Sequence, residues 1–264
     1  MSVNGEYPNG LQVEPNYFLD PEELASLEAE VVERTAEQFP DQVVAAWINP
    51  LHPYANISRT HEASYFPEVA DLDPEYDAAQ EILLLIDTRE GQKRVVHAAT
   101  TTRLSDVSDE EVIEANRTGI YTIDSLIELG NFSAADFLGY YAAQGIDLRK
   151  SLCAETNFRI HPDDPMPPYN YLNSAQLAYL ELYSKLIRED SEVGRTIVIA
   201  TANSKQVRSL QRNGFATEPL LGRDTFTTEE EELGVVSKPL VIPIDENFKN
   251  LMDLIGFKLP VVEY

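Results

Sequence analysis

The chain has 264 residues, of which 43% are hydrophobic and 25% charged, a composition typical of a folded protein that buries a core without disulfides. Twenty lysine and arginine residues stand against forty-five aspartate and glutamate residues, so the formal net charge is −25. This balance argues against a nucleic-acid partner, because phosphates require a basic surface, and against docking on anionic lipid by charge.

Metal, disulfide and membrane features are missing from the sequence pattern. The single cysteine, Cys153, excludes an intramolecular disulfide and a cysteine-based zinc site. The four histidines show no HxxxH or HExxH spacing, and no apolar run approaches the length of a membrane span. Residues 1–10 lack the basic-then-apolar pattern of a secretory signal. We therefore expect a cytoplasmic protein with no metal, no tightly bound cofactor and no integral membrane segment.

The N-terminal part begins with a tail and a helix. Residues 1–19 contain glycine, proline and asparagine without periodicity and are predicted as a tail, followed by a single domain over residues 20–264. Asp20-Pro21-Glu22-Glu23 predicts a helix start, because Asp20 can cap, Pro21 suits the first turn and Glu23 completes a capping box. The helix is expected to end near Phe39, and residues 49–78 are predicted as loop with short pieces.

The rest of the chain alternates between strand and helix patterns. A hairpin is predicted from strands 81–87 and 94–103, and residues 105–150 are predicted as a helical insertion. Further strands are predicted at residues 152–160, 195–201, 215–220 and 239–244, and helices at residues 173–190, 204–213 and from Asp245 to Gly256. This order predicts an α/β fold with a mixed sheet and at least one parallel crossover.

Two stretches resemble known acyltransferases. Ile197–Phe215 (IVIATANSKQVRSLQRNGF) resembles the late strand–helix unit of the GNAT superfamily of N-acyltransferases, with Asn203 after the strand and Gly214-Phe215 after the helix. Tyr76–Arg103 (YDAAQEILLLIDTREGQKRVVHAATTTR) resembles the acyl-homoserine-lactone (autoinducer) synthases and the long-chain N-acyl amino acid synthases. The resemblance runs over roughly residues 59–255. It implies a GNAT-like mixed central sheet flanked by helices, and acyl transfer from a thioester to an amine.

Glu155 is the candidate general base for such a transfer. The amine must lose a proton, and a carboxylate within hydrogen-bond reach can accept it. Strand alternation predicts that Glu155, Asn157 and Arg159 share one face of their strand, as expected where a strand lines a cleft. Two structural alternatives remain open, namely a solvated face and a structural pair between Glu155 and Arg159.

The resemblance also implies roles for Asp77 and Arg103. Asp77 precedes the first hairpin strand and Arg103 ends the second, where the synthases hold the polar acceptor or order the wall of the active site. The alternative is a structural ion pair, because most charged pairs in proteins take no part in chemistry. Backbone N–H donors that polarise the thioester are expected just after the strand, near His161.

Phosphates of an acyl donor require positive potential and free helix N-terminal amides. Residues 185–223 carry seven basic side chains and four acidic ones in an otherwise acidic chain. Within and next to this window, the predicted donor-binding residues are Asn173, Ser174, Asn203, Arg208 and Arg212. Asn173 and Ser174 are expected to cap the central helix. For Arg208 and Arg212, a solvated i,i+4 helix face is the alternative.

The sequence therefore predicts an N-acyltransferase that moves an acyl group, expected to be a fatty acyl group, onto the amine of an amino-acid-like small molecule. The donor is acyl-CoA or an acyl carrier protein. One alternative is an acetyl-CoA-dependent N-acetyltransferase. Leu210, at the helix position where acetyltransferases often place a tyrosine acid, and the missing glycine-rich loop count against it. The other alternative is a GNAT-like binding module without catalysis.

Overall fold

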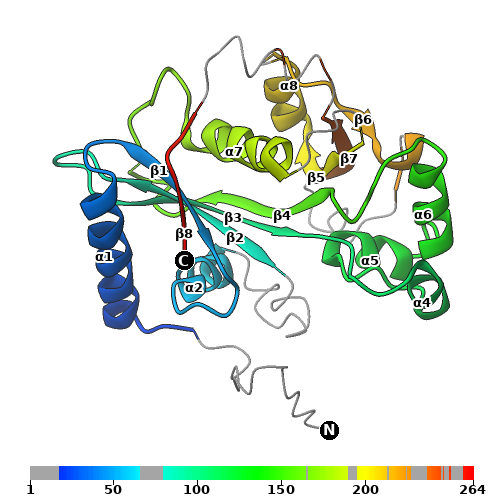
Figure 1. The fold of residues 1–264 in the computed structure, drawn as a ribbon, viewed down its shortest axis with the longest axis horizontal. Coiled ribbons are helices and arrows are strands. Elements are labelled where there is room, and N and C mark those ends of the chain that lie inside the picture. The colour runs from blue at the N-terminus through cyan, green and yellow to red at the C-terminus, as the bar shows by residue number, and fades with distance from the viewer. Residues whose placement is uncertain are drawn as a thin grey trace, which may run out of the picture.

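The computed structural model describes residues 18–65, 80–164, 166–189, 195–212, 214–223, 225–226, 237–244, 246, 250 and 258–264. Its strands form a mixed eight-stranded sheet in the order β6-β7-β5-β4-β3-β2-β1-β8. Helices α7 and α8 lie over one face of the sheet (Figure 1). On the other face, α1 and α2 pack against β1, β2 and β3, and the insertion helices α4, α5 and α6 share a core cluster with β4, β5 and β7. This architecture confirms the predicted α/β class with a mixed sheet, flanking helices and a helical insertion.

The N-terminal part holds α1 (Pro21–Gln38), β1 (Val43–Ile48) and α2 (Ala55–Tyr65). The predicted capping box at Asp20 and Glu23 is confirmed. The sequence reading missed β1, because all six of its residues are apolar and buried and so show no period-two alternation. It also left α2 inside a stretch predicted as loop.

The predicted hairpin is formed by β2 (Glu81–Asp87) and β3 (Arg94–Thr102), which pair antiparallel. The insertion is helical as predicted and contains α4 (Asp109–Ala115), α5 (Tyr121–Glu128) and α6 (Ala134–Ala142). The chain then enters β4 (Leu152–Arg159), which pairs antiparallel with β3.

The predicted parallel crossover is confirmed. From β4 the chain passes through α7 (Ser174–Glu189) into β5 (Ile197–Asn203), which pairs parallel with β4, and α8 (Ser204–Arg212) follows directly. Apolar side chains of α7 such as Leu177, Leu182 and Tyr183 are fully buried against the sheet.

The C-terminal part differs more from the prediction. Instead of a strand over residues 215–220, β6 covers only Glu218–Pro219, and Leu220–Gly222 form a 3-10 turn in which Leu221 has φ 53°. β7 (Ser237–Pro243) pairs with β5, and β8 (Val261–Glu263), which was not predicted, pairs parallel with β1. The predicted last helix lies outside the described residues apart from Glu246 and Asn250, which are helical.

Candidate active site

Strands β4 and β5 separate in the middle of the sheet. They pair over three positions, Leu152↔Val198, Cys153↔Ile199 and Ala154↔Ala200. Beyond them, β4 continues along β3 as far as Arg159, whereas β5 continues along β7 as far as Asn203. We call residues 155–159 of β4 and 201–203 of β5 the fork. Among the described residues, no strand pairs with β4 on its β5 side in the fork.

A β-bulge lies at the start of the fork. Thr101 of β3 pairs with Ala154 and Thr100 pairs with Thr156, so Glu155 is the extra residue on β4. A bulge reverses the alternation of side chains along a strand. The prediction that Glu155, Asn157 and Arg159 share one face is therefore wrong. Glu155 contacts the insertion helix α5, whereas Asn157 contacts His97, which itself contacts α7 on the opposite face.

Three hydrogen bonds hold the Glu155 carboxylate. Its Oε1 accepts from the Thr102 hydroxyl at 2.7 Å, and its Oε2 accepts from the Thr122 backbone N–H at 3.2 Å and from the Thr122 hydroxyl. Burial raises the pKa of Glu155, and the hydrogen bonds from Thr122 and Thr102 oppose that shift because they favour the ionised form. A carboxyl group with a raised pKa is suited to take up and release a proton near neutral pH.

The predicted pair of Glu155 with Arg159 is not formed. Glu155 is held by the two threonines, and Arg159 is exposed and pairs in the ladder with His97. Neither threonine was predicted as a site residue. Thr102 lies at the end of a predicted strand, and Thr122 lies in the predicted helical insertion. The partners of Glu155 depend on the bulge, which has no signature in this sequence.

A second polar cluster lies on the α7 face of the fork. The His97 ring is buried, its Nε2 contacts Asn157 Oδ1, and its Nδ1 lies 3.2 Å from Ser174 Oγ. Burial lowers the pKa of His97 to about 4, so the ring is neutral at neutral pH. Ser174, predicted together with Asn173 to cap the helix, is the first residue of α7 and is buried against His97. His97 was not predicted, because it lies inside an apolar strand pattern.

The N-terminus of α7 is capped as predicted. Asn173 Oδ1 accepts from the Gln176 backbone N–H at 3.0 Å, and Gln176 Oε1 accepts from the Asn173 backbone N–H at 3.0 Å. The Asn173 side chain is thus engaged with its own helix. The structure places α7 and α8 on the same side of the fork (Figure 1).

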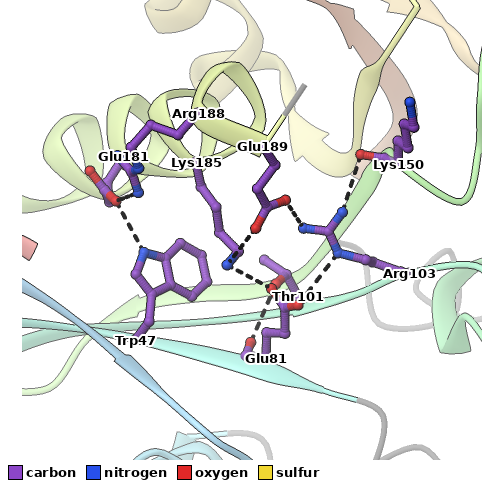
Figure 2. A network of polar contacts seen from close by, with 9 residues as sticks. All are labelled: Trp47, Glu81, Thr101, Arg103, Lys150, Glu181, Lys185, Arg188 and Glu189. Carbon is purple, nitrogen blue, oxygen red and sulfur yellow. Dashed lines mark hydrogen bonds and ion pairs between the residues drawn. The ribbon is translucent and has the colours of Figure 1, made fainter. Parts of the chain in front are cut away.

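Arg103 belongs to an ion-pair network between β2, β3 and the C-terminal half of α7 (Figure 2). Its guanidinium lies 3.4 Å from Glu81 Oε1 and 2.5 Å from Glu189 Oε2, and it donates to the Lys150 carbonyl oxygen at 3.2 Å. Lys185 joins Glu81 and Glu189 at 3.5 and 2.8 Å. Arg103 is thus engaged with two glutamates and a backbone carbonyl in this network. Asp77, its predicted partner in the site, lies outside the described residues.

The same network fixes the only tryptophan. Trp47 is buried, its Nε1 donates to Glu181 Oε1 at 3.0 Å, and Lys185 Nζ lies 4.5 Å from the ring centroid (Figure 2). Arg188 contacts the same Glu181 oxygen at 2.6 Å. Trp47 is therefore a core residue that ties β1 to α7.

The basic window predicted for donor phosphates is divided by these contacts. Lys185 and Arg188 pair with glutamates, whereas Arg208 and Arg212 lie exposed on α8. Asn203 ends β5 at the fork, and its side chain lies outside the described part of the structure. Because α8 begins at Ser204, directly after Asn203, the N-terminus of α8 lies at the fork.

The described residues contain neither a cluster of metal ligands nor a membrane-spanning helix. That part of the chain contains no group of three or more histidine, cysteine, aspartate or glutamate side chains able to hold a metal ion. None of its helices is long and apolar enough to cross a membrane.

Comparisons with known proteins find structural likeness without sequence likeness. No family model matches the chain, and no curated protein matches it. Two solved structures of the CoA-dependent acyl-homoserine lactone synthase BjaI resemble the fold, one with SAM and isopentyl-CoA and one with MTA. Each has a TM-score of 0.47, with 13% and 14% identity respectively, and covers 84% of this chain and 93% of the synthase. Identities this low carry neither a substrate nor a residue role from one chain to the other.

Proposed function

We propose that this protein is an N-acyltransferase, which moves an acyl group from a CoA or carrier-protein thioester to the amine of an amino-acid-like small molecule. The observation that carries the proposal is the Glu155 carboxyl, which lies at a bulge beside the fork and has a raised pKa. An acyl thioester is long and narrow, and the fork offers it unpaired strand edges on β4. The predicted GNAT-like order of strand, helix, strand and helix from β4 to α8 agrees with this use of the fork.

In the proposed reaction, Glu155 takes a proton from the acceptor ammonium group. The free amine then attacks the thioester carbonyl carbon and forms a C–N bond. The C–S bond breaks, and the leaving thiolate takes the second proton, which the new amide nitrogen loses. Glu155 is suited to the first step because Oε1 accepts a hydrogen bond from Thr102 and a carboxylate oxygen has room for a second.

The charge of the chain favours CoA over a carrier protein as donor. An acidic carrier protein is repelled at long range by a net charge of −25. Acyl-CoA is a small ligand that needs only local positive potential, and Arg208 and Arg212 are exposed basic side chains on α8, the helix that begins at the fork. Both donors belong in the first assays.

Binding is tested first by thermal unfolding with CoA, acetyl-CoA and acyl-CoAs of increasing chain length at fixed ionic strength. A ligand of the folded state at one hundred times its Kd adds about 2.7 kcal/mol of stability. We expect a shift that grows with chain length. Equal shifts with acetyl and long chains indicate an acetyltransferase instead, and the absence of any shift removes acyl-CoA as donor.

Catalysis is tested with Glu155→Gln in a free-thiol assay against a panel of amino acids and amines. Loss of a general base lowers kcat by roughly 10²- to 10⁴-fold. Glu128→Gln, at an exposed position at the end of α5, is the matched control and should leave the rate unchanged. Thiol release that is equal in both variants would contradict the role of Glu155.

A further inference from the structure

Asn157 occupies a distinctive place in the fork. It lies two residues after the bulged Glu155, beyond the last position that β4 shares with β5. Because of the bulge, its side chain faces His97 and α7, whereas Glu155 faces α5. The two side chains therefore approach the opening between the strands from opposite faces of the sheet.

The orientation of the Asn157 amide is fixed through its oxygen. Oδ1 contacts His97 Nε2, and His97 Nδ1 in turn lies 3.2 Å from Ser174 Oγ. The neutral ring donates from Nε2 to Oδ1 and accepts the Ser174 hydroxyl proton at Nδ1. This chain of contacts points the other end of the amide away from His97.

The nitrogen of the same amide is left as a buried donor. Asn157 Nδ2 is shielded from solvent, and no acceptor in the described part of the chain meets it in hydrogen-bond geometry. Buried donors in folded proteins are almost always satisfied, so one without an acceptor calls for an explanation, and a ligand oxygen supplies one.

The Tyr179 hydroxyl of α7 lies beside the same amide. Burial raises the pKa of Tyr179, and Asn157, acting as a donor toward it, opposes that shift, so the hydroxyl lies on the nitrogen side of the amide. The hydroxyl therefore keeps its proton at neutral pH. The amide nitrogen carries two hydrogens, and a neighbour on one of them leaves the other for a ligand oxygen. The face of the fork opposite Glu155 thus holds two neutral donor groups and His97, whose ring is neutral.

We propose that Asn157 Nδ2 donates a hydrogen bond to the carbonyl oxygen of the acyl donor, with the Tyr179 hydroxyl beside it, while Glu155 receives the amine proton from the other face of the sheet. The inference rests on the proposed function and deepens it. As the amine attacks, the carbonyl oxygen gains negative charge, and a fixed donor stabilises that charge. When the C–S bond breaks, the electron pair on the oxygen re-forms the C=O double bond and the C–S bonding pair leaves with sulfur. The departing thiolate takes the second proton, which the new amide nitrogen loses, while Glu155 holds the first.

The test separates the carbonyl from the rest of the donor. One probe is an acyl-CoA analogue in which a methylene replaces sulfur, so that the carbonyl persists in an unreactive ketone. The other is an alkyl-CoA thioether of equal length without a carbonyl. We expect the wild-type protein to bind the ketone roughly tenfold more tightly, as one hydrogen bond allows.

Asn157→Asp keeps the oxygen that contacts His97 and replaces the donor by an acceptor. We expect it to lose or reverse the preference for the ketone, to keep its affinity for the thioether, and to lower kcat by roughly 10²- to 10³-fold. Asn157→Leu, which also removes the donor without adding charge, covers the case in which the aspartate variant fails to fold. Asn49→Asp is the matched control, because it makes the same substitution at an exposed asparagine just after β1, outside the fork, whose Oδ1 accepts from the Leu51 backbone N–H.

The outcomes are distinct. A ketone preference that persists in both Asn157 variants overturns the inference and leaves the proposed function intact. A wild-type protein that binds the thioether as tightly as the ketone also overturns the inference and leaves the proposed function intact. Binding of neither probe to the wild-type protein overturns the proposed acyl-CoA function and this inference with it.

Discussion

The two halves of the sheet differ in how completely their strands pair. Strands β1, β2 and β3 pair along their whole lengths, and residues such as Leu83 and Leu84 are fully buried on opposite faces. Strands β4 and β5 share three positions and then separate, and the freed part of β4 carries Glu155, Thr156 and Asn157. We call the fully paired strands β1, β2 and β3 the closed half, which supplies stability. In the fork, one edge of β4 has no strand partner among the described residues, and polar side chains lie there.

One helix, α7, connects the two halves of the sheet. Helix α7 packs on both halves, with Tyr183 in the core and Glu181 and Lys185 tied to Trp47 of β1. A rigid closed half thus positions the N-terminal end of α7 beside the fork. Functional groups held by a rigid scaffold keep the geometry that catalysis needs.

The largest effect is expected in the closed half. Leu84→Ala removes a fully buried side chain from the core beneath α1 and α2 and should lower the free energy of unfolding by about 2–5 kcal/mol. Leu51→Ala, at a side chain 39% exposed, is the control and should change it little. Equal losses in urea unfolding would break the distinction between core and periphery.

His97 of β3, beside the fork, makes the stability of the molecule depend on pH. Its pKa falls from 6.5 to about 4 on folding, so the unfolded chain binds one more proton between those values. Stability from this group is complete above pH 6.5 and is lost as pH falls toward 4, by about 3 kcal/mol in all.

His97→Gln removes that contribution. Between pH 4 and 6.5, the free energy of unfolding of the wild-type protein should rise with pH. In the variant, this slope should be smaller by the amount that the binding of one proton contributes. Asn157, Ser174 and Arg159 face the ring, and of these only the Arg159 charge further opposes protonation. Parallel pH profiles for the two proteins would contradict a buried neutral His97.

Thr122→Val sharpens the description of the Glu155 environment. The Thr122 hydroxyl favours the ionised carboxylate, so its loss raises the pKa of Glu155 further. A hydrogen bond to a charged group is worth on the order of 1.5 kcal/mol, which is about tenfold in the ionised fraction. The acid limb of the pH–rate profile should move to higher pH with the plateau kept. A lower plateau with an unmoved limb would assign Thr122 to packing alone.

The smallest effect is expected at the cap of α1. Asp20→Ala removes the acceptor of two backbone N–H groups, at 2.9 Å each, and should cost about 1 kcal/mol of stability. Glu33→Ala, on the exposed surface of the same helix, is the control. A cost confined to stability, with acyl transfer unchanged, would confirm that α1 supports the closed half only.

Local patterns predicted the elements that depend on near neighbours. The capping box at Asp20, the hairpin around Glu90-Gly91 and the crossover through α7 all follow from residues a few positions apart. β1 was missed because a strand buried on both faces has no alternation, and β8 was missed because three residues gain strand structure only from pairing with β1.

The sequence by itself determined the α/β class, the helical insertion and the choice of Glu155 as the carboxylate of interest, because hydrophobic period, capping residues and a charged residue in a strand are local properties. Only the tertiary structure decided what surrounds that carboxylate. The bulge that separates Glu155 from Asn157, the threonines that hold it and the burial of Ser174 against His97 depend on how β3 and β4 pair. Strand register is a long-range property, and a shift of one residue moves every following side chain to the other face.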